Sequence, residues 1–379
     1  MDSIILIAQT ALDDQSDGVW NKVQSQFEAL CSISKNVDLV CYAEKNIVMR
    51  SYKDGIIQDL NLRNNSLIPR KIVLWRTIFN VLRNNKYGFA YIRYPVIDFE
   101  VLKVLKKMHS NGTRIVMEIP TYPLEVQHAK GALKLAYMVD SICHDACSRY
   151  IEKIVYIGNK TDTIFGCKAQ QIPNGIPVSL TGEKITGFRV CNGHVKLIAV
   201  STMRIWHGYE RLIKGLAEYY HSGNCPAIVD LVLIGDGPYK EEYKKIAKDN
   251  NIEDHVIFTG KLSGKKLQDE YEDATVGVGS LGLYNNGMFI GSTLKTREYL
   301  LRGIPFVYGC EELGISKDYP YALLVPNDSS TISINSILNF IYPLIEDSEK
   351  ISMAMNTYAK EEFSWKKILC EVFNINSNG

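Results

Sequence analysis

The sequence lacks a charge excess of either sign and lacks long apolar runs. Lysine and arginine number 43, against 42 aspartates and glutamates, which excludes a general electrostatic attraction to nucleic acid. No stretch approaches the ~20 apolar residues of a membrane-spanning helix. The apolar run from Ile4 to Ala8 is short and has no basic flank, so no secretory signal peptide is predicted. These features predict a cytoplasmic protein that recognises charged partners only through local patches.

A regular cysteine pattern is also missing. The nine cysteines are odd in number and irregularly spaced, which argues against a secreted disulfide framework and favours a reducing compartment. Cys143, His144 and Cys147 form one cluster, but a CHxxC arrangement without a second pair is more typical of a helix with buried small residues. We therefore expect no metal and no bound cofactor.

The chain of 379 residues is too long for one ordinary core and suits two α/β domains. Short β-branched runs alternate with segments of helical spacing, which indicates parallel sheets with right-handed crossovers. Strands are predicted at 4–8, 37–42, 89–92, 114–118, 154–157, 195–200, 229–234, 256–258, 276–279 and 305–308. Helices are predicted at 19–30, 98–109, 209–220, 239–249, 267–271 and 294–302.

A turn-rich segment from Ile172 to Gly193 separates two βαβ systems of similar size and is the best candidate for a linker. The first domain is predicted at residues 1–178 and the second at 190–355. Ligands of such sheets bind at the carboxyl ends of the strands. The loops that follow strands in the second domain are therefore the places to look for chemistry.

One such loop is Gly235-Asp236-Gly237-Pro238. Its two glycines allow the backbone to approach a ligand closely, although a plain strand-to-helix turn explains the same residues. No GxGxxG fingerprint follows any predicted strand, which argues against a dinucleotide-dependent dehydrogenase.

Two further loops place cationic or titratable groups at helix starts. Arg204 and His207 precede one helix, and Lys295 lies in the first turn of another. The helix dipole disfavours a cation at this end unless an anion is bound. Glu298 lies three residues after Lys295 on the same helix face. A bound diphosphate with a carboxylate one turn deeper is one interpretation; a surface loop and an ion pair between Lys295 and Glu298 are the alternative.

Taken in order, these motifs resemble the C-terminal domain of GT-B glycosyltransferases of family 4 (group 1). The residues that carry the resemblance are Arg204, His207-Gly208, Gly235-Asp236-Gly237-Pro238, Leu294-Lys295-Thr296-Arg297-Glu298-Tyr299 and Gly303-Ile304-Pro305. In the first domain, Asp17-Gly18, Pro173-Asn174-Gly175-Ile176 and Glu118-Ile119-Pro120-Thr121-Tyr122-Pro123 resemble the glycine-rich loop, the end-of-domain turn and a motif of polysaccharide-assembly members.

The resemblance implies a GT-B fold, in which two Rossmann-like domains face a cleft, with a C-terminal helix at 356–379 that crosses back to the first domain. It implies transfer of a sugar from a UDP- or GDP-linked donor to a glycan or lipid-linked glycan, in bacterial surface polysaccharide (capsule or O-antigen) synthesis and with retention. The implied catalytic residues are Arg204, His207, Lys295 and, by position only, Asp17. The implied donor-binding residues are Gly18, Gly235, Gly237, Ser292, Thr293, Leu294 and Glu298. The implied acceptor-side residues are Glu118, Thr121 and Tyr122.

The sequence departs from the family pattern in three ways. His207 stands where the family has the Lys of its donor-phosphate pair. Ile290 stands where the family has the first Glu of its E-x7-E pattern, and Asn285, Asn286 or Ser292 are the plausible substitutes. The catalytic-region His of the family's first domain has no counterpart near Pro120-Thr121.

The segment from Arg70 to Arg83 is both basic and apolar. Such a helix could rest on an anionic leaflet and reach a lipid-linked acceptor; a core helix with a basic outer face explains the pattern as well. Two other functions also remain open: a two-lobed binding protein without chemistry, and a sugar-nucleotide epimerase of the same architecture.

Overall fold

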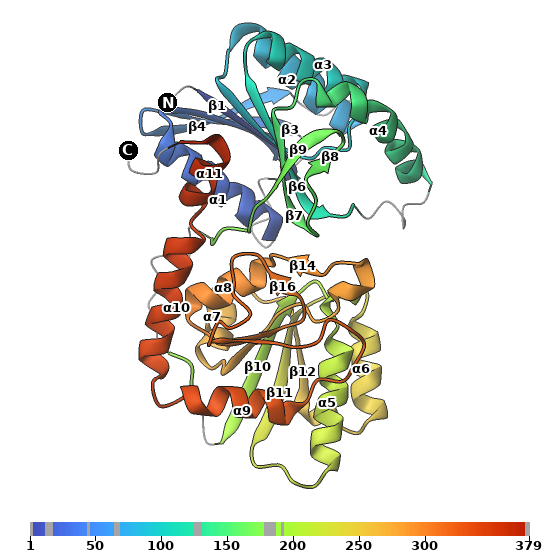
Figure 1. Cartoon of the computed structure of the whole chain (residues 1–379), viewed down its shortest axis with the longest axis vertical. Coiled ribbons are helices and arrows are strands. Elements are labelled where there is room, and N and C mark those ends of the chain that lie inside the picture. The colour runs from blue at the N-terminus through green and yellow to red at the C-terminus, as the bar shows by residue number, and fades with distance from the viewer. Residues whose placement is uncertain are drawn as a thin grey trace. The chain divides into compact units, whose positions relative to one another are not determined.

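The computed structural model describes residues 3–11, 18–43, 46–63, 69–124, 131–177, 187–190 and 193–375. The chain forms two compact units (Figure 1). Unit 1 comprises Met1–Ile172 with Trp365–Gly379, and unit 2 comprises Pro173–Ser364. Residues 356–362, which the sequence assigns to the final helix, instead complete the helix α10 (Ser348–Glu362) of unit 2. Only α11 (Trp365–Phe373) returns to unit 1.

Unit 1 is built on a nine-stranded sheet of order β4-β3-β2-β1-β5-β6-β7-β9-β8. The parallel strands include all five that the sequence predicts for this unit. The sequence does not predict the antiparallel hairpin β3–β4 at one edge. The strands are β1 (Ile4–Ala11), β2 (Asn36–Ala43), β3 (Asn46–Lys53), β4 (Ile56–Arg63), β5 (Phe89–Arg93), β6 (Arg114–Tyr122), β7 (Lys153–Gly158), β8 (Thr163–Ile164) and β9 (Cys167–Gln171).

Helices cover both faces of this sheet because its strands are apolar on both sides. Along β1, Ile5 and Ile7 pack with α2, α3 and α4, whereas Ile4 and Leu6 pack with α1 and α11. Figure 1 shows α1 and α11 side by side. The helices are α1 (Gly18–Ile33), α2 (Arg70–Asn84), α3 (Phe99–Ser110) and α4 (Ala132–Ser148).

The basic helix α2 uses its apolar side in the core. Trp75 and Ile78 are fully buried, and two of its cations form ion pairs with α3 and its N-cap residue: Lys71 with Asp98 at 2.7 Å and Arg76 with Glu100 at 2.9 Å. A core helix with a basic outer face therefore accounts for this segment. Among the described residues, no helix is at once long and apolar enough to cross a membrane.

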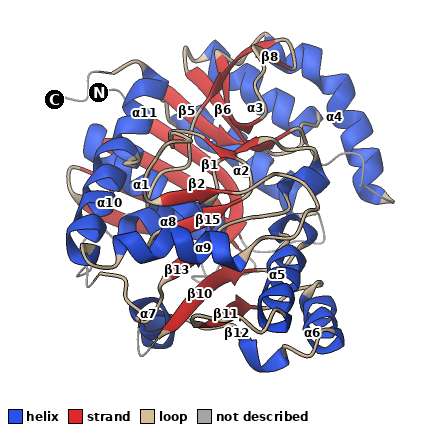
Figure 2. Cartoon of the chain, turned by 60° about the horizontal axis from the view of Figure 1, so that its bottom comes forward, coloured by secondary structure: helices blue, strands red, loops and turns tan. Residues whose placement is uncertain are grey.

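Unit 2 is built on a six-stranded parallel sheet of order β12-β11-β10-β13-β15-β17, with the small pair β14–β16 beside it. Figure 2 shows these strands in red and the helices in blue. The strands are β10 (His194–Ser201), β11 (Ile228–Gly235), β12 (Val256–Gly260), β13 (Val276–Val278), β14 (Ile290–Gly291), β15 (Phe306–Tyr308), β16 (Glu311–Glu312) and β17 (Ala322–Leu324). The helices are α5 (Tyr209–His221), α6 (Lys240–Asp249), α7 (Gly264–Glu272), α8 (Leu294–Arg302), α9 (Ile334–Ile341) and α10, with 3-10 turns at Ile205–His207, Glu253–His255, Leu283–Asn286 and Tyr342–Leu344.

A charged cluster lies inside unit 1, at the end of β6. The Glu118 carboxylate is fully buried and lies 2.5 Å from the Lys22 ammonium, 3.6 Å from the Arg93 guanidinium and 2.7 Å from the Gln26 amide. Lys22 also lies over the Trp365 ring, 5.3 Å from its centroid. The cluster therefore joins α1, β5, β6 and α11. Burial alone raises the pKa of Glu118, but the two neighbouring cations outweigh it and lower that pKa to about 2.

We predict that Glu118→Gln lowers the free energy of unfolding of unit 1 by about 3–5 kcal/mol at neutral pH, because the buried Lys22 and the half-buried Arg93 lose their counter-charge. The folded pKa of Glu118 lies below the ordinary value of about 4.3. Its contribution is therefore complete above about pH 4.3 and is lost as the pH falls towards 2, so wild type and variant converge in acid.

Urea unfolding followed by tryptophan fluorescence measures this effect. In a Trp206→Phe background the remaining tryptophans all lie in unit 1. Glu152→Gln is the matched control, because Glu152 pairs with Arg114 on the surface and such pairs contribute only about 0–1 kcal/mol. Equal effects of the two substitutions contradict the prediction.

Candidate functional site

The direction of strand succession in unit 2 reverses between its two central strands. From β10 the chain proceeds to β11 and β12 on one side, then crosses to β13, β15 and β17 on the other. This is the Rossmann order, and ligands of such sheets bind beyond the carboxyl ends of the strands at the reversal point. The loops after β10 and β13 flank this point. The first carries Arg204 and His207, and the second leads through β14 to the start of α8, where Lys295 lies.

These two loops are held in direct backbone contact. Leu281 N–H donates to the His207 carbonyl at 2.9 Å, and Gly282 N–H donates to the Trp206 carbonyl at 3.2 Å. Gly208 has a φ of 62°, and a Cβ there would lie 2.5 Å from the Gly282 nitrogen. Only glycine fits both this conformation and this approach. Gly208 therefore fixes the geometry of the reversal point.

Close contacts with a neighbouring loop explain why residues 235 and 237 are glycines. The resemblance implies that these two glycines bind the donor. A Cβ on Gly235 would lie 1.9 Å from the Ser201 carbonyl oxygen, and one on Gly237 would lie 1.7 Å from that of Thr202. The loop after β11 thus packs directly on the loop after β10. The absence of side chains serves protein packing here, and a ligand is not needed to account for it.

His207 is buried, and its Nδ1 accepts a hydrogen bond from the Arg204 backbone N–H at 2.8 Å. Its ring stacks on Tyr209, with centroids 5.5 Å apart and planes 11° apart. Burial, together with the positive charges of Lys295 and Arg204, lowers the pKa of His207 to about 2. Of the two possibilities that the sequence left open, a cationic or a titratable group, His207 is therefore not cationic at neutral pH. The ring is neutral, and because Nδ1 accepts, its proton lies on Nε2.

Lys295 and Arg204 supply the charge that His207 does not. The Lys295 ammonium donates to the Tyr209 hydroxyl at 3.0 Å and lies 5.3 Å from that ring's centroid. Burial lowers the pKa of Lys295 to about 7, although Glu312 opposes the shift. Arg204 is exposed, and its guanidinium lies 5.7 Å from the centroid of the Trp206 ring. The structure thus brings Arg204, His207 and Lys295 together, as the sequence predicts.

The start of α8 offers free backbone donors. Thr293 is the N-cap residue; its hydroxyl accepts from Thr296 N–H at 3.4 Å, and its own N–H donates to both oxygens of Glu312, at 3.1 and 3.2 Å. The next two N–H groups, of Leu294 and Lys295, have no acceptor among the described residues. These donors and the helix dipole together favour an anion.

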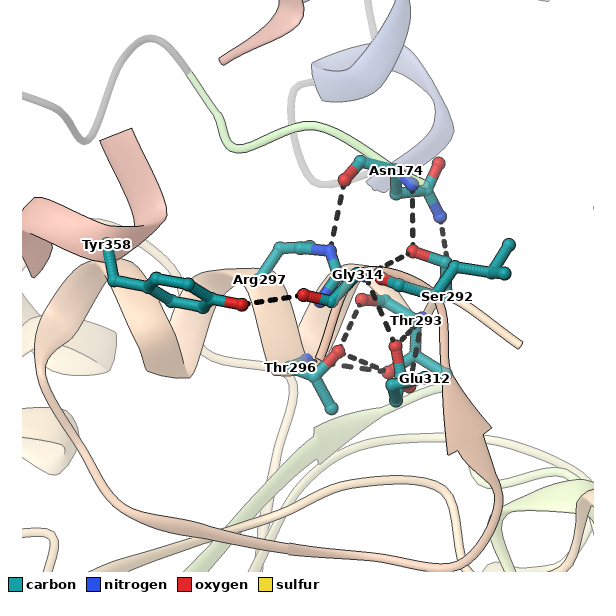
Figure 3. Close-up of polar contacts among 9 residues, drawn as sticks. Asn174, Ser292, Thr293, Thr296, Arg297, Glu312, Gly314 and Tyr358 are labelled. Carbon is teal, nitrogen blue, oxygen red and sulfur yellow. Dashed lines mark hydrogen bonds and ion pairs between the residues drawn. The ribbon is translucent and has the colours of Figure 1, made fainter. Parts of the chain in front are cut away.

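Arg297, which the sequence analysis does not single out, holds this helix start in place (Figure 3). It is fully buried. Its guanidinium donates to the Asn174 carbonyl at 3.0 Å, to the Ser292 hydroxyl at 2.7 Å and to the Leu313 carbonyl, and it lies 3.6 Å from Glu312. A cation at the centre of the motif that carries Lys295 and Glu298 is the signal that could have identified it.

The Ser292 hydroxyl therefore forms its hydrogen bonds with other groups of the protein. It accepts from the Asn174 N–H at 2.8 Å as well as from Arg297, and its carbonyl accepts from the Asn174 side-chain amide. Among the substitutes for the missing glutamate at position 290, Ser292 is thus committed elsewhere. Ile290 itself lies in β14 and is half-buried.

Glu298 does not pair with Lys295. Its carboxylate accepts from the Arg302 guanidinium at 2.9 Å, one turn further along α8. The Arg302 guanidinium in turn donates to the side-chain oxygen of Gln268 at 2.6 Å and lies over the Tyr271 ring, 4.0 Å from its centroid. The simple alternative of an ion pair with Lys295 is wrong, and a role towards ribose stays a prediction.

The residues of unit 1 that the resemblance implies for binding have varied surroundings in the structure. Glu118 belongs to the buried cluster described above and is not available to an acceptor. Thr121 and Tyr122 end β6 and are half-buried, and Tyr122 packs edge-on against Tyr156 at 5.6 Å. Gly18 opens α1 and is exposed, and Asp17 lies outside the described residues.

The CHxxC cluster is accounted for by packing. Cys143 and Cys147 are buried in the core of unit 1. The His144 Nε2 lies 2.9 Å from a carboxylate oxygen of Asp140, and the His144 ring stacks on that of Phe165 with the centroids 3.5 Å apart. Across the described ranges, no three His, Cys, Asp or Glu side chains gather in a way that could hold a metal ion.

Comparison with known proteins agrees with this geometry. Residues 194–341 match the family described as glycosyl transferases group 1, and no curated protein matches the sequence. Among solved structures, the sucrose-phosphate synthase of Thermosynechococcus elongatus matches with a TM-score of 0.59 at 16% sequence identity. The match covers 99% of this chain and 98% of the synthase chain. The lipopolysaccharide outer core galactosyltransferase WaaB has a TM-score of 0.59 at 14% identity, with 98% and 99% coverage.

A third match is the catalytic domain of starch synthase IV from Arabidopsis thaliana, bound to ADP and acarbose, with a TM-score of 0.63 at 10% identity and 98% coverage of each chain. Identities this low establish the fold alone. The expected GT-B fold is confirmed, whereas membership of family 4 stays a prediction. The chain therefore has the fold of GT-B glycosyltransferases, and residues 194–341, which contain the reversal point, match glycosyl transferases group 1.

Proposed function

We propose that this protein is a glycosyltransferase that moves a sugar from a nucleotide-diphosphate donor to a glycan or lipid-linked glycan acceptor. The observation that carries the proposal is the convergence of Arg204, Lys295, the neutral His207 and the free N–H groups at the start of α8 on one point of the sheet. These groups are all donors or cations, so the ligand they suit is an anion rich in acceptor oxygens. The donor is UDP- or GDP-linked.

In the proposed reaction, the bond between the anomeric carbon and the diphosphate oxygen breaks while a bond to an acceptor hydroxyl oxygen forms, and the proton of that hydroxyl passes to the leaving diphosphate. Negative charge develops on the leaving diphosphate. Lys295, Arg204, the Nε2–H of His207 and the α8 amides stabilise that charge electrostatically without reorganisation. Glu298 lies one turn deeper along α8, where its carboxylate would accept hydrogen bonds from ribose hydroxyls. No metal ion enters this scheme.

The family match and the GT-B neighbours support this activity. They do not identify the donor base, the acceptor or the linkage. Retention of configuration and a hexosyl donor are proposed from the resemblance. A role in surface polysaccharide synthesis, on the cytoplasmic side and in peripheral contact with the membrane, is proposed from the same resemblance and from WaaB, which acts on the lipopolysaccharide outer core.

Release of nucleotide diphosphate tests the class of activity directly. Release that depends on an acceptor supports transfer. Binding of a nucleotide sugar without release indicates a binding protein, and conversion of the donor sugar without any acceptor indicates an epimerase. A thermal-shift panel of nucleotide sugars identifies the donor to use, because a ligand that binds only the folded state raises the melting temperature.

We predict that Arg204→Ala and Lys295→Ala each weaken binding of the matching nucleoside diphosphate ~10–150-fold. The reason is the loss of a charge-assisted hydrogen bond, which contributes about 1.5–3 kcal/mol. Isothermal titration calorimetry measures the change, and circular dichroism confirms that the fold persists. Lys214→Ala, at an exposed position on α5, is the control. Unchanged affinity in both site variants contradicts the proposal that the diphosphate binds at this position.

We predict that binding of the same nucleoside diphosphate weakens as the pH rises above about 7. The pKa of Lys295 is about 7 in the free protein, and an adjacent diphosphate raises it. Binding therefore takes up a proton above pH 7, and the affinity falls by up to about tenfold per pH unit. Lys295→Arg carries a charge that does not titrate, so its affinity should stay constant over pH 6.5–8.5 apart from the ligand's own ionisation. Identical pH profiles for wild type and Lys295→Arg contradict the prediction.

We predict an altered preference for the donor sugar, because Ile290 cannot accept a hydrogen bond where related enzymes offer a carboxylate. A buried, unpaired sugar hydroxyl costs about 1–3 kcal/mol. Calorimetry should therefore show tight binding of the free nucleoside diphosphate and a ~5–150-fold preference for a deoxy or amino sugar over a fully hydroxylated hexose. Asn285 or Asn286 could still replace the carboxylate. A preference for the hydroxylated hexose that survives substitution of both contradicts the prediction.

A further inference from the structure

Positive charge is concentrated on the helices α2, α3 and α4, which form one layer on the sheet of unit 1 (Figure 1). These three helices contain eight lysines and arginines against three aspartates and glutamates. The helices on the opposite face of the sheet, α1 and α11, contain three against two, and the whole chain has 43 against 42. The excess of cations therefore belongs to one side of unit 1.

Several of these cations face the solvent without a carboxylate partner. Arg83, Lys106 and Lys134 are exposed, and within the described residues none of the three forms an ion pair. Lys103 lies 3.5 Å from the Glu100 carboxylate, but its side chain is 64% exposed. Exposed ion pairs of this kind hold their partners weakly. The charge of this layer is therefore accessible to an external anionic partner.

Exposed apolar side chains lie in the same layer. On α4, Leu135, Met138 and Ile142 are 63%, 58% and 75% exposed, and their spacing places them on one face of the helix. Phe99, the first residue of α3, is 65% exposed. The opposite side of α4 packs into the core of unit 1 through Cys143. The helix α4 is thus apolar on its solvent side as well as on its core side, which is typical of a surface that meets an apolar partner.

The loop between β5 and α3 joins the three helices at one end of the sheet. Lys71, near the start of α2, pairs with Asp98 at 2.7 Å and donates to the Val96 carbonyl. Asp140, in the middle of α4, accepts from the Ile97 N–H. The starts of α2 and α3 and the middle of α4 therefore meet beyond the carboxyl end of β5. The strand order of unit 1 reverses at β5, so this is also the end at which a ligand of the sheet would bind.

We propose that the exposed side of α2, α3 and α4 rests on an anionic lipid surface, with Phe99 and the α4 stripe of Leu135, Met138 and Ile142 buried at the boundary between headgroups and acyl chains. Lysine and arginine near such a surface are attracted to its headgroups, and apolar side chains enter it by ~5–10 Å. A nucleic acid would match the charge, but it offers no acyl region for the apolar stripe. The helix α2 has its apolar side in the core, so it contributes charge alone.

The proposal names a surface for the membrane contact of the proposed function, and it rests on that function only for the lipid-linked acceptor that such contact would bring to unit 1. The charge and the exposed apolar groups all belong to unit 1, whereas the proposed diphosphate site belongs to unit 2. Lipid binding and nucleotide binding can therefore be tested separately.

Co-sedimentation of the full chain with vesicles tests the charge. We expect binding to vesicles of equal parts phosphatidylglycerol and phosphatidylcholine, and at least ~10-fold weaker binding to phosphatidylcholine alone. Lys103→Gln combined with Lys106→Gln should weaken binding to the anionic vesicles ~10–30-fold, because each cation near an anionic surface contributes roughly fivefold. Lys245→Gln combined with Lys248→Gln is the matched control. These two lysines are also exposed and three residues apart, but they lie on α6 of unit 2, so binding should match that of the wild type.

The apolar stripe distinguishes a lipid surface from other anions. Met138→Ser combined with Ile142→Ser should weaken binding to the anionic vesicles at least ~10-fold. Both side chains are exposed in the free protein, so circular dichroism should show an unchanged fold. Ile257→Ser combined with Met353→Ser is the matched control, because these residues are 43% and 56% exposed in unit 2. This control should bind the vesicles as the wild type does.

Three outcomes overturn the proposal: a wild type that stays in the supernatant with anionic vesicles, vesicle binding that the Lys103 and Lys106 variant retains in full, and vesicle binding that the Met138 and Ile142 variant retains in full. If transfer RNA also displaces the wild type from the vesicles in the last case, the face belongs to a nucleic acid. Calorimetry with the matching nucleoside diphosphate should give the same affinity for all variants. A failure of lipid binding with intact nucleotide binding therefore leaves the proposed sugar transfer standing.

Discussion

The ion pair between Arg297 and Glu312 is the interaction on which the arrangement of the reversal point depends. Both side chains are almost completely buried, and neither charge could be removed from water without the other and without further polar contacts. Arg297 therefore needs the carbonyls of Asn174 and Leu313, and Glu312 needs the N–H of Thr293. Arg297 also lies 3.9 Å from the centroid of the Phe363 ring. Satisfying one buried charge pair thus fixes the first and last segments of unit 2 against the start of α8.

The same ion pair shapes the electrostatics that a ligand meets. The Glu312 carboxylate accepts from the N-cap N–H of α8, and the next two N–H groups have no acceptor in the described part of the chain. Lys295, Thr296, Arg297 and Glu298 follow one another in sequence, but the rotation of about 100° per residue in a helix separates their surroundings. Arg297 points roughly opposite to Lys295, so one cation is enclosed by protein while the other stays half-buried beside Tyr209. These two cations, two residues apart in the sequence, therefore have different surroundings: protein groups satisfy Arg297, whereas Lys295 is the cation proposed to bind the anion.

Much of the fold could be predicted from the sequence because it rests on local patterns. Buried parallel strands read as short β-branched runs, and α8 is bounded by its N-cap Thr293 and by Gly303, which has a φ of 70°. The β3–β4 hairpin was missed although Asp54-Gly55 is a recognised turn signal. The placements that could not be predicted all depend on tertiary contacts. Glu118 is enclosed by cations from α1 and β5, Gly235 is explained by the backbone of a neighbouring loop, and His207 is neutral because of what surrounds it.

The position of the site, in contrast, follows from topology. In both sheets the chain starts at a central strand, builds outward on one side and then crosses to the other side, from β4 to β5 in unit 1 and from β12 to β13 in unit 2. The reversal leaves a gap between the helices that follow the two central strands, and backbone amides face it. In unit 2 this gap is bordered by Arg204 and Lys295, and within the described ranges neither forms an ion pair with a carboxylate, although Glu312 raises the pKa of Lys295. A fold that places a reversal there, and two cations beside it, together support the proposal of an anionic ligand without any acid–base motif.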